Sequence, residues 1–239
     1  MRFLFCLALI LLAALPARSQ TEVELELVLL ADASSSIRGS EFDLQVGGYA
    51  RAFRDPTVIA AIQDLGGNGI AVTFVQWSAT FQQFDTVPWQ RIRTGGDAAA
   101  FADEIEAQAR KVVSFGTATG SALEYGGQLF EGNGFAGKRR VIDLSSDEHS
   151  NQGPHPRGVR PGIIARGITI NGLAILDDDF DLAGYFRDAV IGGPESFVMV
   201  VDGYADFAEA VRRKLVREIS GRPVAELHQP RLRASYETR

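Results

Sequence analysis

The amino-acid sequence predicts one doubly wound α/β domain, with a mainly parallel sheet of about six strands, one antiparallel edge strand and helices on both faces. Apolar strand-like segments alternate with amphipathic helical segments, which is typical of a parallel sheet covered by helices. The first strand segment, residues 23–31, ends in a nearly unbroken apolar run, as expected for a strand buried on both faces. Residues 81–87 follow the strand segment 70–77 and can return beside it as the antiparallel edge.

The individual elements follow from changes in the hydrophobic period. After residue 40 the apolar side chains fall on one helical stripe, and Ser40 with Asp43 resembles an N-terminal cap. Asp55-Pro56 begins a second short helix, since proline is favoured in the first turn. Strands are expected at 23–31, 70–77, 81–87, 141–145, 168–175 and 196–201. Helices are expected from Ser40 and from Pro56, and at 98–112, 120–130, 159–166, 181–189 and 204–219.

The first 19 residues have the layout of a secretory signal peptide. Arg2 gives a positive start, residues 3–15 are apolar, and Ala17-Arg18-Ser19 supplies small residues for cleavage after Ser19. The apolar run is shorter than the roughly 20 residues that a membrane-spanning helix needs, although an uncleaved anchor is the alternative. No second apolar stretch of that length follows. We therefore expect an exported chain, periplasmic or secreted, without stable membrane insertion after cleavage.

The domain is expected at residues 20–220, followed by a flexible polar tail at 221–239. Cleavage removes Cys6, the only cysteine, so disulfide bonds are excluded from the mature chain. It also removes Arg2 and Arg18, and the loss of these two positive charges changes the formal charge from −6 to −8. Nucleic acid is excluded as a partner of so acidic a product, because its phosphates are bound by Lys and Arg. The oligomeric state stays open.

Oxygen-bearing side chains gather in three loops of the predicted sheet. The first strand runs out into residues 32–36, Asp-Ala-Ser-Ser-Ser, and the strand 141–145 runs out into Ser-Asp-Glu at 146–148. A third loop, Gly-Thr-Ala-Thr-Gly at 116–120, precedes a helix. Ligands of open α/β sheets bind at the carboxyl ends of the strands. Carboxylates and hydroxyls without imidazole or thiolate select Mg²⁺, with Mn²⁺ or Ca²⁺ as alternatives.

The set D-x-S-x-S, T-x-T-G and a strand-terminal S-D, in that order, resembles the metal-ion-dependent adhesion site of von Willebrand factor type A domains. The resemblance implies hydroxyl ligands at Ser34, Ser36 and Thr117, with Asp32 and Asp147 acting directly or through water. It also implies the six-stranded sheet with one antiparallel edge. Two carboxylates and three hydroxyls would leave one coordination position open, and a protein partner presenting a carboxylate could fill it. Thr119 is the second candidate for the threonine ligand.

The chain is also similar to a poorly characterised family of exported bacterial proteins of this fold, which has no established activity. This closer likeness supports the fold more than a function. It is carried by the segments 75–78, 139–143, 151–153, 167–173 and 190–194.

The residue after Asp147 departs from the type A pattern, in which a glycine is common. Glycine permits a positive φ or a close approach of two segments, whereas this chain has Glu148. Glu148 can change the loop, place a third carboxylate near the ion, or occupy the open position in the unbound protein.

Two other functions compete with a metal-dependent binding module. An exported hydrolase would use Ser34 or Ser36 with His149, but the sequence has no G-x-S-x-G elbow. A structural scaffold with a non-functional metal site is the second alternative, chiefly because of Glu148. Non-enzymatic binding is therefore expected.

Other polar residues receive structural interpretations. Asp143, inside an apolar strand, is expected to be buried and satisfied by a hydroxyl or an amide. His149 and His155 are expected on an exposed loop, and residues 177–179, three consecutive aspartates, in a solvated turn.

Overall fold

The computed structural model describes residues 20–112, 115–176 and 181–221. The predicted signal peptide, the aspartates 177–179 and all of the predicted tail except Gly221 lie outside these residues. No helix within the described ranges is long and apolar enough to cross a membrane.

The fold is built on one mixed sheet of six strands in the order β3-β2-β1-β4-β5-β6. All neighbouring strands are parallel except β2 and β3, which pair antiparallel at the edge. The predicted sheet is therefore confirmed. The strands are β1 (Thr21–Asp32), β2 (Ile70–Trp77), β3 (Gln83–Ile92), β4 (Phe135–Ser146), β5 (Ile168–Ile175) and β6 (Val198–Val201).

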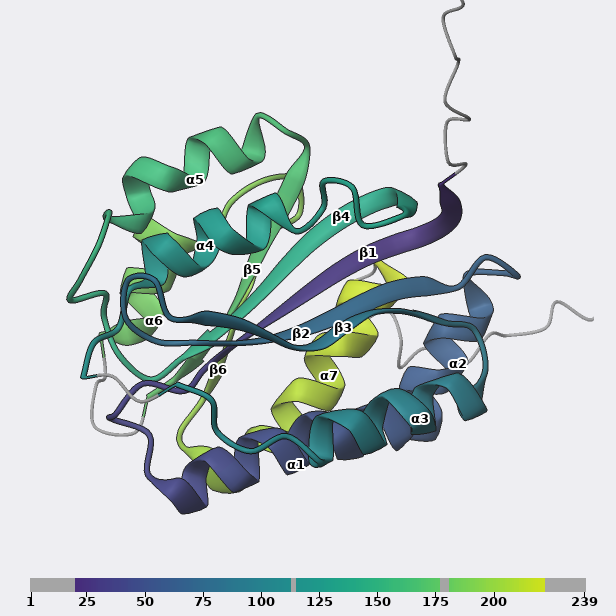
Figure 1. Ribbon diagram of the computed structural model, residues 1–239, viewed down its shortest axis with the longest axis horizontal. Helices are drawn as coiled ribbons and strands as arrows, with labels where there is room; N and C mark the ends of the chain where they lie inside the picture. Colours follow the sequence, from purple (N-terminus) through teal and green to yellow (C-terminus); the bar gives the residue numbers. More distant parts are fainter. Residues whose placement is uncertain (1–19, 113–114, 177–180, 222–239) are drawn as a thin grey trace, which may run out of the picture.

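Helices cover both faces of the sheet (Figure 1). One face carries α1 (Gly39–Arg54), α2 (Pro56–Asp64), α3 (Gly95–Glu106) and α7 (Phe207–Ser220). The other carries α4 (Thr119–Gln128), α5 (Pro156–Ile164) and α6 (Leu182–Tyr185). A π-helical turn, Phe186–Val190, follows α6, and a 3-10 turn, Tyr204–Asp206, precedes α7.

Alternate residues of β1 enter two separate cores. Leu27 and Leu29 are fully buried against the α1, α3 and α7 layer, while Val28 and Leu30 are fully buried on the opposite face. Both faces of the strand are thus apolar, which is why its sequence reads as a continuous run rather than an alternating pattern. The site discussed below lies where this central strand ends.

The predicted helix at 98–112 is wrong at both ends. It begins three residues earlier, where Thr94 and Asp97 form a reciprocal N-terminal cap, and it ends at Glu106. The next residues leave the helix because Gln76, fully buried in β2, binds their backbone. Its amide accepts a hydrogen bond from the N–H of Lys111 at 2.7 Å and donates to the carbonyl of Ala109 at 3.0 Å.

The predicted cap at Ser40 and Asp43 is also wrong, because α1 begins at Gly39 after Arg38. The side chain of Glu41 accepts a hydrogen bond from the N–H of Arg38 at 2.6 Å. The second helix does begin with Asp55-Pro56, and Asp55 accepts a hydrogen bond from the N–H of Thr57.

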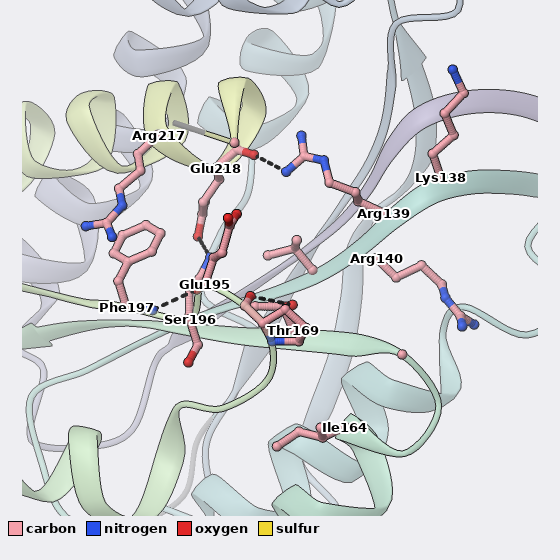
Figure 2. Close-up of a pocket in the computed structure, with 15 residues that line it drawn as sticks. Lys138, Arg139, Arg140, Ile164, Thr169, Glu195, Ser196, Phe197, Arg217 and Glu218 are labelled. Carbon is pink, nitrogen blue, oxygen red and sulfur yellow. Dashed lines mark hydrogen bonds between the residues drawn. The ribbon is translucent and has the colours of Figure 1, made fainter. Parts of the chain in front are cut away.

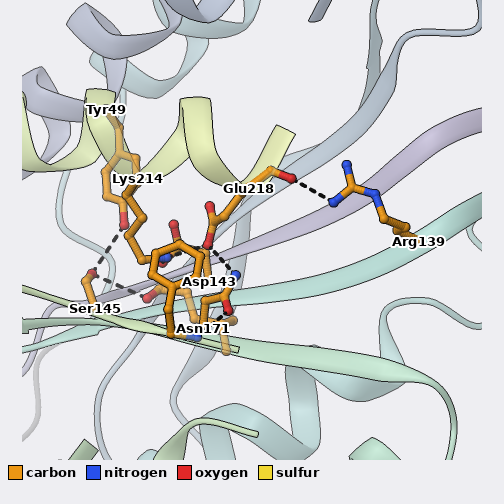
Figure 3. Close-up of polar contacts among 9 residues, drawn as sticks. Tyr49, Arg139, Asp143, Ser145, Asn171, Lys214 and Glu218 are labelled. Atoms are coloured by element: carbon orange, nitrogen blue, oxygen red, sulfur yellow. Dashed lines mark hydrogen bonds and ion pairs between the residues drawn. The ribbon is translucent and has the colours of Figure 1, made fainter. Parts of the chain in front are cut away.

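A buried ionic cluster joins β4 to α7 between the sheet and that helix (Figure 3). The Lys214 ammonium lies 2.5 Å from both the Asp143 and Glu218 carboxylates, and all three side chains are at most 2% exposed. Asn171 donates to the same Glu218 oxygen at 2.9 Å. Asp143 is buried as expected, but its charge is balanced by a lysine rather than by a hydroxyl or an amide alone.

Because one lysine faces two carboxylates, the cluster favours a bound proton. Burial, and next the charge of Asp143, raise the pKa of Glu218 from 4.5 to about 8, against the opposing effect of Lys214. Between these values the folded chain holds a proton that the unfolded chain releases, so this group's contribution to stability falls as pH rises.

The free energy of unfolding of the wild type should fall between pH 5 and pH 9. We expect this fall to be smaller in Glu218→Gln, by more than about 1 kcal/mol. Urea unfolding of wild type and variant across that range measures this difference. Glu131→Gln, at an exposed surface acid, is the control and should follow the wild-type curve. Parallel curves for wild type and Glu218→Gln would contradict the raised pKa.

Candidate metal centre

The candidate site lies at the topological switch of the sheet. β1 pairs with β2 on one side and with β4 on the other, and Ala31 is in register with Ser145. The carboxyl ends of β1 and β4 therefore lie side by side. This adjacency brings together the loops that begin at Asp32 and at Asp147, and ligands of open α/β sheets bind at such a position.

The loop after β1 aims three of the predicted ligands at one region. An Asp32 carboxylate oxygen accepts a hydrogen bond from the N–H of Ser34 at 2.8 Å, which turns the chain back on itself. The hydroxyls of Ser34 and Ser36 lie 3.0 Å apart. Asp32 and Ser34 are buried, and Ser36 is half-buried. The residues of the D-x-S-x-S motif thus form a compact turn.

The second carboxylate joins this turn from β4. The Ser36 hydroxyl donates to an Asp147 carboxylate oxygen at 2.9 Å across 111 residues of sequence. Ser146 donates to the other oxygen of Asp32 at 2.5 Å. Tyr204, from the turn before α7, donates to Asp147 at 3.3 Å. Four of the five predicted ligands therefore belong to one hydrogen-bonded network.

Thr117, the fifth predicted ligand, reaches the network through Glu148. Its hydroxyl donates to a Glu148 carboxylate oxygen at 2.9 Å, and Asn151 donates to the same oxygen at 3.4 Å. The backbone of Thr117 is paired with Asn151 in both directions, at 2.9 Å each. Thr119, the second candidate, is buried at the start of α4.

Arg110 holds the aspartate loop, a role that no pattern in the sequence indicates. Its guanidinium donates to the carbonyls of Ala33, Ser34 and Ile37. Gln45 of α1 donates to the carbonyl of Asp32 at 2.7 Å. Arg110 was expected inside a helix; it is free to reach the loop because α3 ends at Glu106.

Both aspartates carry raised pKa values. Burial, and next the negative charge of Asp147, raise the pKa of Asp32 to about 7. Burial also raises the pKa of Asp147 to about 6, assisted by the charge of Glu148 and opposed by the hydrogen bond from Ser36. Two buried carboxylates that repel each other favour a bound proton or cation. The residues therefore fit a hard dication.

The donor set differs from a site of clustered acids and histidines. Among the described residues, no group of three or more His, Cys, Asp or Glu is placed to hold a metal ion. Any cation here would depend on serine and threonine hydroxyls as much as on carboxylates, and such ligands suit Mg²⁺ better than zinc or copper.

The histidines lie beside the candidate centre. The His149 ring stacks on Tyr185 with centroids 4.1 Å apart, and the Tyr185 hydroxyl accepts a hydrogen bond from the N–H of Ser150 at 3.2 Å. His155 caps α5. Both histidines are partly exposed or exposed, as expected of a surface loop. They line a cavity of about 380 Å³ together with Arg157, Asp181, Gly184, Tyr185, Asp188 and Ala189.

A larger cavity, of about 630 Å³, lies at the amino-terminal ends of β4 and β5, whereas the candidate centre lies at the carboxyl ends of the strands (Figure 2). It is lined by the amino-terminal parts of β4 and β5 and by the end of α7. Arg139 donates there to the carbonyl of Glu218 at 2.8 Å. The Arg217 guanidinium lies 3.7 Å from the centre of the Phe197 ring.

The sheet, its two helical layers and the strand-end loops define a von Willebrand factor type A-like domain. The vWF domain of the type V pili tip protein Mfa5 from Porphyromonas gingivalis matches with a TM-score of 0.59 and 12% identity. That match covers 82% of this chain and 95% of the other. At such identity the similarity shows the fold.

Proximal thread matrix protein 1 of the mussel byssus, with a zinc occupied MIDAS motif, matches with a TM-score of 0.58 and 18% identity. The match covers 84% of this chain and 49% of the byssus protein, so the chain spans about half of that relative. The pilus adhesin SpaC from Lactobacillus rhamnosus GG, in its open conformation, matches with a TM-score of 0.56 and 15% identity. That match covers 85% of this chain and 31% of SpaC.

The chain belongs to the family described as "Protein of unknown function (DUF1194)", whose profile matches residues 22–223. No curated protein matches the chain in sequence.

Proposed function

We propose that this protein is an exported binding module that holds a divalent cation and binds a partner protein through an acidic side chain. Mg²⁺ is the proposed cation, with Mn²⁺ or Ca²⁺ as alternatives. The proposed ligands, directly or through water, are Asp32, Ser34, Ser36, Thr117 and Asp147.

The observation that carries this proposal is the hydrogen bond from Ser36 to Asp147, which joins two loops 111 residues apart around two buried carboxylates. Burial first, and in addition the charge of a neighbouring carboxylate, raise the pKa values of Asp32 and Asp147, and a dication would stabilise the charged form of both. Support also comes from the similar structures, which include a zinc-occupied motif and pilus adhesins. The oxygen-only donors of this chain favour Mg²⁺ over zinc.

Binding is proposed rather than hydrolysis because of the hydrogen bonds that Ser34 and Ser36 make. A nucleophilic serine must give its proton to a base such as histidine. The Ser36 hydroxyl donates instead to Asp147, and it lies 3.0 Å from the Ser34 hydroxyl. The His149 ring stacks on Tyr185. A scaffold with a non-functional metal site predicts the same fold and no cation binding, so metal titration separates that alternative.

We expect isothermal titration calorimetry to detect binding of Mg²⁺ and Mn²⁺ to the wild type and to detect none with Asp32→Ala. Asp32 is fully buried between the serine loop and Ser146, so its removal deletes charge from the centre of the network. Asp64→Ala, at an exposed residue of α2, is the matched control and should bind as the wild type does. Equal heats for wild type and Asp32→Ala would refute the site.

The partner is tested by capture from the exporting cell with Mg²⁺ and again with a chelator. A bridging cation predicts a partner that is retained with Mg²⁺ and released by the chelator. A partner that is retained equally in both conditions would contradict the bridging mechanism.

A further inference from the structure

Glu148 is turned toward the candidate centre. It is half-buried, and one oxygen of its carboxylate accepts hydrogen bonds from the Thr117 hydroxyl at 2.9 Å and from Asn151 at 3.4 Å. Its backbone N–H donates to the Ser146 hydroxyl at 3.3 Å. Ser146 in turn donates to Asp32 at 2.5 Å. Both its backbone and its side chain are therefore tied to residues of the centre.

The loop that carries Glu148 is held in place. Thr117 and Asn151 pair through two hydrogen bonds of 2.9 Å, and the Ser150 hydroxyl donates to the carbonyl of Thr117 at 3.2 Å. Gly153, at φ +68°, bends the chain back toward α4. Glycine adopts this left-handed backbone conformation without strain because it has no Cβ. The inward position of Glu148 follows from this packing.

Thr117 is the link between Glu148 and a cation. A threonine hydroxyl can donate its proton to a carboxylate and still offer a lone pair to a metal ion. If Thr117 is a ligand, the Glu148 carboxylate lies one hydrogen bond from the ion. No three acids of the described residues are placed to hold a metal ion together, so direct coordination requires the Glu148 carboxylate to move from the Thr117 hydroxyl to the ion.

The charges around the proposed ion also favour a role for Glu148 as a ligand. Two aspartates neutralise a dication, and Glu148 adds a third carboxylate whose charge acts on Asp147. A third anionic ligand satisfies the ion without any acid from outside the chain. The open position of a type A site is the one it would fill.

We propose that Glu148 is an internal carboxylate ligand that occupies the position a partner's acidic side chain would take, so that a partner must displace it. This inference rests on the proposed metal site. Glu148 belongs to the same molecule and already contacts Thr117, so it competes with a free carboxylate without the translational and rotational cost of association. Free carboxylates therefore bind the loaded site only when Glu148 is removed.

The test uses the full-length protein loaded with Mn²⁺, whose bound waters are counted by water-proton relaxation. Glu148→Gln keeps the size and removes the charge, while Glu148→Gly restores the residue common in type A sites. We expect both variants to gain about one Mn²⁺-bound water and to bind Mn²⁺ at least about tenfold more weakly. Sodium acetate is the probe carboxylate; it should displace that water in the variants and leave the wild type unchanged.

Glu131→Gln, an acid paired with Arg166 on the surface, is the matched control and should keep the wild-type water count. Unchanged water number and affinity in Glu148→Gln, with binding still lost in Asp32→Ala, would overturn the internal-ligand proposal and leave the metal site standing. Absence of Mn²⁺ binding to the wild type would overturn both. A variant that gains a water while Asp32→Ala abolishes binding supports both.

Discussion

Lys214→Ala is expected to lower the free energy of unfolding by about 3–5 kcal/mol, because it leaves two buried carboxylates without a cation. Lys214 is fully buried, and its ammonium lies 2.5 Å from both Asp143 and Glu218. No water-exposed position is available to either acid, since both are at most 2% exposed. Chemical denaturation at pH 9 or above measures the effect, because Glu218 has a pKa of about 8 even beside Lys214 and at lower pH would hold a proton that relieves the repulsion.

A matched variant separates the loss of charge from the loss of packing. Lys214→Met combined with Asp143→Asn and Glu218→Gln keeps side-chain volume while removing all three charges. We expect this triple variant to be much closer to the wild type than Lys214→Ala, as replacement of a whole buried ionic group is often tolerated. A cost below about 1 kcal/mol for Lys214→Ala would show that water reaches the cluster.

Gly120→Ala is expected to destabilise the fold by about 3 kcal/mol and to weaken cation binding. A Cβ at this position would lie 1.9 Å from the carbonyl oxygen of Pro154 and 2.8 Å from its carbon. The obstacle is backbone, so α4 and the loop at Pro154 must separate. That separation would disturb the pairing of Thr117 with Asn151 beside the proposed site.

Gly158→Ala is the control for this substitution, since nothing lies within 4 Å of a Cβ there and the residue is in α5. We expect its stability to be unchanged or higher by up to about 1 kcal/mol, as alanine is the better helix former. Calorimetric melting of both variants, with Mg²⁺ titration, measures the two effects. Equal stability of Gly120→Ala and the wild type would disprove the close contact.

The sheet was predictable because its signal is local. β1 is buried on both faces and ends in a continuous apolar run, so its existence follows from the sequence. The proposed ligands Asp32 and Asp147 were also accessible, because strand ends in a parallel sheet share one edge. Their pairing through Ser36 depends on β1 lying next to β4, a neighbour relation that the structure shows and that the sequence does not predict.

The missing parts depend on contacts that no local pattern encodes. Arg110 acts through three carbonyl groups of a distant loop, and its position depends on Gln76 ending α3 early. Lys214 lies on α7, and the carboxylate of Asp143 explains its burial only once β4 and α7 pack together. Hydrogen bonds to backbone carbonyls and buried ion pairs cannot be predicted from the hydrophobic period of the sequence.

The grip of Arg110 on the aspartate loop has a consequence for how the proposed ligands respond to change. Arg110 and Thr117 belong to the same connection between α3 and α4, seven positions apart in number. Arg110 restrains the turn that carries Ser34 and Ser36, and Asn151 holds the backbone of Thr117. A cation would therefore meet ligands whose spacing is largely set beforehand by these hydrogen bonds.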